Sequence, residues 1–157
     1  MASFRVAAFA AMTSLACLPS VAQASTCWYP EEARAAQIRG LQTMLMVGTL
    51  QCRHRSRASE HLYTDFILNQ RRFLDHNSAI LKARFVRENG WRDAQGAYDR
   101  FATSLANRYS EQLDASFFCE TVHRYARLAA RASREQLMDL ADAVAVPPMI
   151  GQCRAPA

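Results

Sequence analysis

The chain has 157 residues, half of them hydrophobic, with 19 basic and 14 acidic side chains and a formal net charge of +5. The charge is spread along the chain and gives little support for nucleic-acid binding, so we expect no nucleic-acid partner. After its first 24 residues, no apolar run approaches 18 residues, so we expect no membrane span.

Residues 1–24 have the pattern of a secretory signal peptide. Arg5 gives a positive start, and Val6–Leu18 is an apolar run that is too short to span a bilayer. Ala22-Gln23-Ala24 is a small-x-small cleavage site. We therefore expect this segment to be removed and the protein to be periplasmic or secreted.

A competing interpretation of this segment is lipidation at Cys17. The preceding residues place Ser14 where a lipobox prefers an aliphatic side chain. We favour cleavage after Ala24, which leaves 133 residues (157 minus 24) as a single helical domain over 25–157. That length is sufficient to bury a core.

Residues 31 to 53 are predicted to form one long helix that is buried on most sides. Pro30 suits the first helical turn, and no charged residue occurs from 40 to 52. Gly40 and Gly48 are poor helix formers, and they indicate the close approach of a neighbouring helix, with a ligand that touches the backbone as the alternative. The apolar stripe recurs at helical spacing through Ile38, Leu41, Leu45, Gly48 and Cys52.

Four more helices are predicted after the first. The second runs from about Ser59 to Asn89-Gly90, the third begins near Asp93, the fourth begins near 115, and a Ser133–Gln136 capping box opens a short fifth that Pro147-Pro148 stops. No segment alternates with a period of two. We therefore predict an all-α fold, an antiparallel bundle of four main helices plus a short fifth, stapled by two disulfides.

The mature chain has four cysteines, which allow three disulfide connectivities. A straight helix over 31–53 would hold Cys27 and Cys52 about 35 Å apart, whereas a disulfide needs Cα atoms within roughly 7 Å. In an antiparallel bundle, Cys119 begins the fourth helix beside Cys52. We therefore predict the pairs Cys52–Cys119 and Cys27–Cys153. The spacings show no Cys-x-x-Cys, so we expect neither a zinc site nor a covalent haem.

The stretch QCRHRSRASEHL, residues 51 to 62, is the most unusual in composition. Arg53, Arg55 and Arg57 suit the solvated end of a helix, where cations offset the negative end of the dipole. The same three arginines are our candidate anion-binding patch for a phosphate, a lipid headgroup or an acidic partner. Two further interpretations are an extension of this patch by Arg71 and Arg72, if they face the same side, and a metal site through His54 and His61.

Other motifs give little support for catalysis. Glu120-Thr-Val-His123 is a Glu-x-x-His, but a di-iron bundle needs two such motifs and the chain has one. There is no Gly-x-Ser-x-Gly, no Gly-rich phosphate loop and no Gly-x-Gly-x-x-Gly. We therefore expect no catalytic residue, no metal and no cofactor.

Several stretches resemble a group of short secreted bacterial proteins that are all-helical and have four cysteines. The similar stretches are the mature start at Cys27-Trp28, LQTMLMVGTLQCR, YDRFATSLANRYS and the two late cysteines, and they span nearly all of residues 27 to 153. These are core and disulfide residues, so the resemblance implies a fold and no catalytic residue. Some members carry the name S-adenosyl-L-homocysteine hydrolase. Enzymes with that activity are much longer and use NAD on a Rossmann domain that this chain lacks, so we treat that name as a misnomer.

The sequence thus favours an exported, disulfide-stabilised helical protein of the bacterial envelope. We expect a non-catalytic binding or interaction module whose partner is an unknown envelope protein or a small ligand. The alternatives are a small periplasmic hydrolase that uses His123 or Glu120, and a binder of anions or lipid surfaces through Arg53, Arg55 and Arg57.

Overall fold

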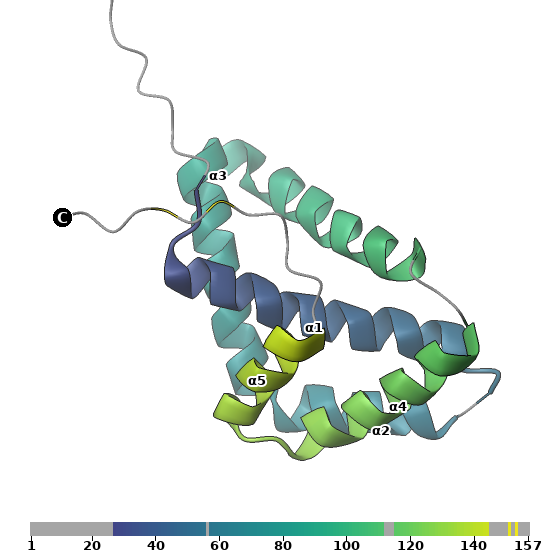
Figure 1. The fold of residues 1–157 in the computed structure, drawn as a ribbon. Helices are drawn as coiled ribbons and strands as arrows, with labels where there is room; N and C mark the ends of the chain where they lie inside the picture. The colour runs from purple at the N-terminus through teal and green to yellow at the C-terminus, as the bar shows by residue number, and fades with distance from the viewer. Residues whose placement is uncertain (1–26, 56, 112–114, 145–150, 152, 154–157) are drawn as a thin grey trace, which may run out of the picture.

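The computed structural model describes residues 27–55, 57–111 and 115–144, together with Gly151 and Cys153. The elements in these residues are all helices, which confirms the all-α prediction (Figure 1). The predicted signal peptide, the alternative at Cys17 and the stop at Pro147-Pro148 lie outside them. Across the described part, no helix is both long enough and apolar enough to cross a bilayer. The helices are α1 (Pro30–Cys52), α2 (Ala58–Asn69), α3 (Arg71–Glu111), α4 (Ala115–Arg131) and α5 (Arg134–Val144).

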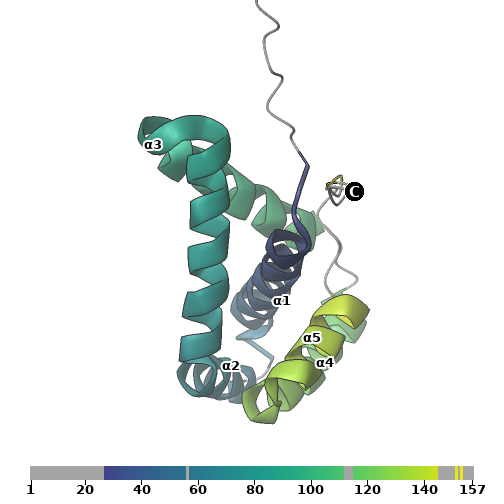
Figure 2. The same cartoon turned by 90° about the vertical axis from the view of Figure 1, so that its left-hand side faces the viewer.

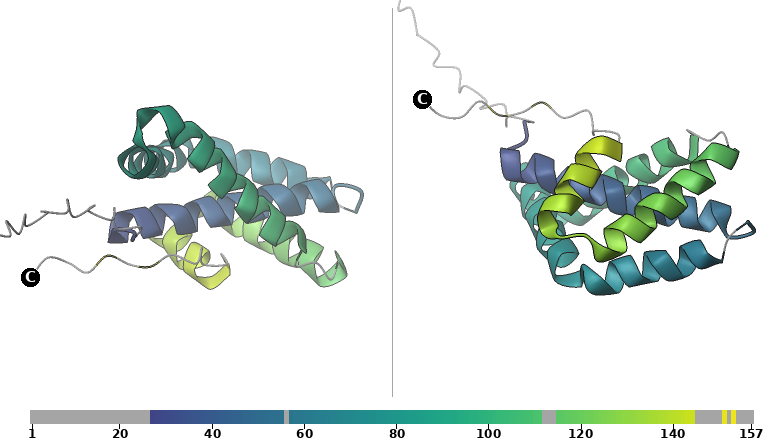
Figure 3. Two further views of the ribbon diagram at one scale, coloured as in Figure 1. Left: turned by 90° about the horizontal axis from the view of Figure 1, so that it is seen from above. Right: turned by 60° about the horizontal axis from the view of Figure 1, so that its bottom comes forward.

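Helix α1 lies at the centre of the molecule and contacts each of the other four described helices (Figures 1 and 3). Pro30 occupies the start of the helix, as predicted. At Gly48, α4 approaches so closely that a Cβ atom would overlap the side chain of Val122. The prediction that Gly48 marks a close helix approach is therefore confirmed.

The predicted continuous second helix is wrong, because the chain turns at Gln70. This residue has φ −100° and ψ 6°, and it separates α2 from α3. The side-chain amides of Asn69 and Gln70 donate to carbonyl oxygens at the end of α4, at 3.0 Å to Ala130 and 2.9 Å to Ala132. The last carbonyls of a helix have no partner within it, so the corner at Gln70 supplies the cap that α4 needs.

A second turn falls at Gly90, inside α3. Its φ of 73° and ψ of 163° interrupt the helix, as predicted for Asn89-Gly90, although the helix resumes directly and Asp93 does not begin it. The part of α3 before Gly90 crosses α1, and the part after it returns toward the end of α1 that carries Cys52 (Figures 1 and 2). The arrangement therefore departs from the simple antiparallel bundle that the sequence predicts.

Both predicted disulfides are confirmed. Cys52 bonds to Cys119 with Cα atoms 5.5 Å apart, and Cys27 bonds to Cys153 with Cα atoms 4.8 Å apart. Beside the second bridge, the N–H of Trp28 donates to the carbonyl of Gly151 at 2.8 Å, and the N–H of Cys153 donates back at 3.0 Å. The first bridge joins the end of α1 to α4, and the second joins the segment before α1 to the segment after α5.

Two apolar cores lie on either side of α1. One joins α1 to α2, α4, α5 and the two ends of α3, and its largest fully buried members are Leu41, Leu45, Phe66, Tyr109 and Leu137. The other joins the start of α1 to both parts of α3 and is aromatic, with Trp28, Phe85, Tyr98 and Phe101 in contact. The turn at Gly90 makes this second core, because it folds α3 back over the start of α1.

Two polar features are satisfied locally, and one of them was predicted. Asn77 is buried, and its amide donates to the carbonyl of Phe73 at 2.8 Å. Ser133 and Gln136 form the predicted capping box, in which the Ser133 N–H donates to Oε1 of Gln136 and the Gln136 N–H donates to Oγ of Ser133.

Candidate functional site

The turn between α1 and α2, residues 53–57, is here called the arginine turn. Its described side chains, including Arg53, Arg55 and Arg57, are exposed. Cys52, directly before it, is fully buried and bonded to Cys119. The Arg55 N–H also donates to the Cys52 carbonyl at 2.9 Å. The start of the arginine turn is therefore tied covalently to both α1 and α4.

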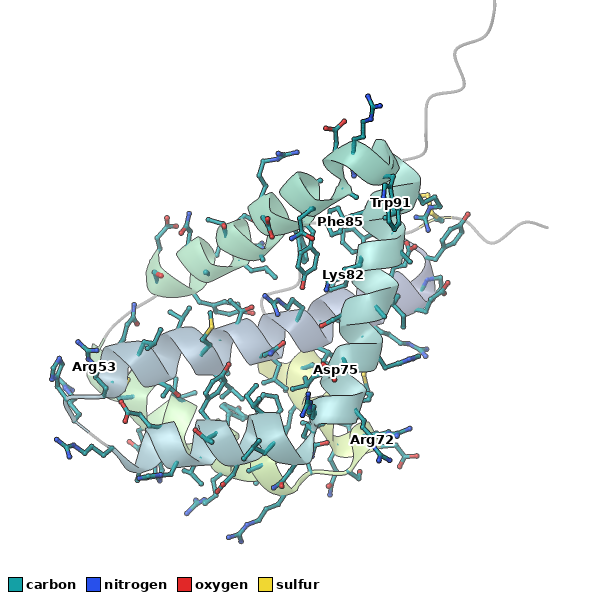
Figure 4. The ribbon with its side chains drawn as sticks, turned by 180° about the vertical axis from the view of Figure 1, so that it is seen from behind. Arg53, Arg72, Asp75, Lys82, Phe85 and Trp91 are labelled. Atoms are coloured by element: carbon teal, nitrogen blue, oxygen red, sulfur yellow. A yellow bond between two sulfur atoms is a disulfide. The ribbon has the colours of Figure 1, made fainter. Side chains whose placement is uncertain are left out.

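The charges of the arginine turn are not neutralised by the described residues around it. The ion pairs among those residues lie on α1 and α3 and include none of Arg53, Arg55 and Arg57. Figure 4 shows Arg53 at the outer end of α1. Three guanidinium groups thus face solvent on a short segment that follows the Cys52–Cys119 bridge.

Apolar side chains adjoin this basic turn. Met46 and Leu50 remain 36% and 59% exposed. With Arg53 they follow one another at spacings of four and three residues, which places all three on one face of the helix. The end of α1 therefore presents exposed apolar and basic groups together.

Arg71 and Arg72 do not extend the arginine turn. They begin α3, whereas the turn precedes α2, so the whole of α2 separates them. Twelve residues of helix span about 18 Å. Figure 4 shows Arg53 and Arg72 well apart, at opposite ends of this region.

The two histidines of the same stretch are not assembled into a metal site. His54 and His61 are exposed, and Nε of Arg53 lies 3.4 Å from Nε2 of His54. Within the described ranges, no three or more His, Cys, Asp or Glu side chains are grouped to hold a metal ion.

His123 contacts a serine that sequence reasoning did not pair with it. Its Nδ1 lies 3.3 Å from Oγ of Ser59, and this contact links α4 to α2. A serine nucleophile must reach its substrate and needs a base that a third group orients. Ser59 is fully buried, and Glu120 is exposed with no hydrogen bond to His123 among the described residues. The contact therefore gives no support to the hydrolase alternative.

A buried ion-pair cluster at the start of α1 was also missed by sequence reasoning. Glu32 is 4% exposed and accepts hydrogen bonds from the Tyr29 N–H at 2.9 Å and from both terminal nitrogens of Arg87. Nε of Arg84 lies 3.7 Å from the same carboxylate. The Arg84 guanidinium also lies 3.7 Å from the centre of the Trp28 ring. The cluster joins the N-terminal segment to α3.

The electrostatics of this cluster favour the ionised forms of Glu32 and Arg87, whereas burial lowers the pKa of Arg84. Burial raises the pKa of Glu32, but the hydrogen bonds from Arg87 and Tyr29 and the charges of Arg87 and Arg84 outweigh it, so that the pKa lies below its usual range. The hydrogen bond to Glu32 raises the pKa of Arg87. A carboxylate held in this way does not exchange protons near neutral pH, so the cluster stabilises the fold and is a poor general acid or base.

Comparison of the chain with models of protein families, with curated proteins and with solved structures finds no match. The function is therefore inferred from the residues of the chain itself, and the arginine turn is the candidate site that both the sequence and the geometry favour.

Proposed function

We propose that the protein is an exported, non-catalytic binding module of the bacterial envelope, and that its arginine turn docks onto an anionic lipid surface. The observation that carries this proposal is the exposure of Arg53, Arg55 and Arg57 on a turn anchored by Cys52–Cys119, with no ion pair to a described residue. Anionic lipid headgroups would supply the missing counter-charges.

The neighbouring apolar side chains favour a lipid surface over a soluble anion. Interfacial binding combines basic residues with apolar side chains that enter the headgroup region. Leu50 and Met46 are exposed on the face that leads to Arg53. Each arginine near an anionic membrane surface contributes about 1 kcal/mol, so three contribute about 3 kcal/mol, or roughly a hundredfold in partitioning.

A vesicle sedimentation experiment tests this proposal. The mature, oxidised protein is mixed with vesicles of phosphatidylglycerol and phosphatidylcholine, or of phosphatidylcholine alone, at low ionic strength. We expect binding to the anionic vesicles only. Because surface charges are screened within about 3 Å in 1 M salt, added salt should abolish it. Binding that is independent of salt or of phosphatidylglycerol would contradict the proposal.

The chain offers a matched control for the arginines. The variant Arg53→Ala/Arg55→Ala/Arg57→Ala should lose roughly a hundredfold in partitioning. The variant Arg71→Ala/Arg72→Ala/Arg134→Ala removes the same charge from exposed positions on α3 and α5 and should retain most of the binding. Equal losses would mean that net charge alone drives association.

Export is tested separately by the mass of the protein recovered from its own envelope. We expect a chain that begins at Ser25, without a lipid and with four hydrogens fewer than the fully reduced form, as two disulfides require. A lipid on Cys17 would replace the signal-peptide prediction with an anchored form.

A further inference from the structure

A groove between α4 and α5 has the size and lining of a small-molecule site. Its volume is about 540 Å³, which falls in the usual range for ligand pockets. Leu128, Ala132 and Leu140 make its wall more apolar than polar, and Arg127 and Arg131 add two cations. None of these residues belongs to the arginine turn.

The two arginines of the groove carry like charges on one face of α4. Arg127 and Arg131 are four residues apart on α4, so their side chains are neighbours, and both are exposed. The ion pairs among the described residues include neither of them. A bound anion would offset these like charges, and a carboxylate suits the planar guanidinium geometry well.

The charge of the lining selects a monoanion. Asp139 also lines the groove, so the two arginines and this carboxylate sum to a net charge of +1. A phosphate monoester carries a charge of about −1.5 to −2 and would leave negative charge uncompensated beside Asp139. A single carboxylate matches the lining.

The apolar wall requires a ligand with a hydrocarbon body. Leu128 is 48% exposed. It follows Arg127 directly on α4 and lies three residues before Arg131. Covering it would contribute about 25 cal/mol for each Å² of apolar surface removed from water. We propose that the α4–α5 groove binds a small amphiphilic monoanion, an aliphatic chain that ends in a carboxylate.

This site is independent of the proposed function. Cys119 ties the first turns of α4 to the arginine turn, whereas Arg131 ends α4 twelve residues later, about 18 Å away along the helix. Loss of ligand binding in the groove would therefore leave vesicle binding by the arginine turn unchanged.

Three matched probes test the proposal on the mature, oxidised protein. Decanoate, below its micelle concentration, has both the charge and the hydrocarbon body, while decanol lacks the charge and acetate lacks the body. We expect decanoate to bind in isothermal titration calorimetry, with amide shifts in α4 and α5 by NMR, and the other two to bind at least about tenfold more weakly. Equal binding of decanol, absence of decanoate binding, or shifts centred outside these helices would overturn the proposal.

Variants of exposed residues provide the second arm. Arg127→Gln/Arg131→Gln should weaken decanoate binding by about tenfold or more, and Leu128→Asn should weaken it as well. Arg124→Gln is the matched control, because Arg124 lies on the same helix, is exposed and contacts the ring of Tyr125 outside the groove. Circular dichroism confirms that each variant is folded. An equal loss in Arg124→Gln would show unspecific attraction and overturn the assignment.

Discussion

Gly48 of α1 and Val122 of α4 pack so closely that no Cβ atom fits between them. Val122 is fully buried, and Cys52 and Cys119 lie one helical turn from this contact on their respective helices. The close approach therefore supports the Cα separation of 5.5 Å at the disulfide. One small residue and one covalent bond together fix the position of the arginine turn.

We predict that Gly48→Ala destabilises the protein. The added Cβ would overlap Cγ2 of Val122 and lie 3.0 Å from its Cγ1, and a buried valine has little freedom to move. Overpacking costs about 1–3 kcal/mol, which exceeds the gain of about 1 kcal/mol from better helix propensity. Urea unfolding of the oxidised protein measures the net effect.

Two further variants control for the propensity term. Gly96→Ala lies in α3, where the nearest atom to an added Cβ is the mobile end of Arg100 at 3.4 Å, so it should stabilise slightly. Adding Val122→Ala to Gly48→Ala should cost less than the sum of the two single changes. Strict additivity would show that the two side chains do not compete for the same space.

Gly90→Ala should destabilise the protein for a different reason. An added Cβ there would meet no atom within 4 Å, so packing is not at stake. The combination of φ 73° and ψ 163° lies in a region that is almost restricted to glycine, and other residues pay about 1–3 kcal/mol to adopt it. The free energy of unfolding should fall by that amount. An unchanged value would mean that the turn relaxes freely.

Glu32→Gln should destabilise the protein at neutral pH by about 3 kcal/mol, because it removes the buried carboxylate charge that Arg87 and Arg84 share. Glu31→Gln changes the same charge in the same helical turn at an exposed position, and should cost less than about 1 kcal/mol. Chemical unfolding of both variants compares the two positions directly.

The effect of Glu32 should also depend on pH. Its pKa is lower in the folded protein than in the unfolded chain, so its contribution is complete above the ordinary carboxyl range. The contribution falls as the pH drops through the folded pKa, from about pH 4.5 downward. The stability difference between the native protein and Glu32→Gln should therefore shrink in acid. A difference that grows in acid would contradict the direction of the pKa shift.

Removal of the Cys52–Cys119 bridge should destabilise the protein by about 4 kcal/mol in the chain-entropy view, given the 67 residues that separate the cysteines. We also expect Cys52→Ser to leave a single thiol, on Cys119, that reacts with a maleimide. Peptide mapping identifies the labelled cysteine. Labelling of Cys27 or Cys153 in that variant would mean that the pairing rearranges.

Features that depend on local chemistry could be predicted from the sequence. Pro30 and the Ser133–Gln136 box depend on neighbouring residues at a helix start, and the disulfide pairing followed from the length of α1. Gly48 could be recognised because glycine is poor in a helix without a packing reason. Figure 3 shows that the central place of α1, expected from its apolar surface, also holds.

The rest depends on contacts between distant segments. The corner at Gln70 has no glycine or proline, and it exists because Asn69 and Gln70 cap the carbonyls of α4. The sequence signal for this corner was the pair of adjacent amide side chains, Asn69 and Gln70, in an otherwise apolar helical pattern. Glu32 looked like an ordinary first-turn acid because Arg84 and Arg87 are more than fifty residues away. The α4–α5 groove was missed because its two cations are ordinary surface residues until α5 folds beside them.

The Cys27–Cys153 bridge closes the backbone between these cysteines into a covalent ring. This ring limits what a protease can release. A single backbone cut anywhere between these cysteines leaves the two pieces joined. A cut after Arg55, an exposed site of the kind that trypsin-like proteases prefer, would leave the pieces joined twice, because Cys52 and Cys119 fall on opposite sides of it. A nick at this exposed site would therefore release no fragment.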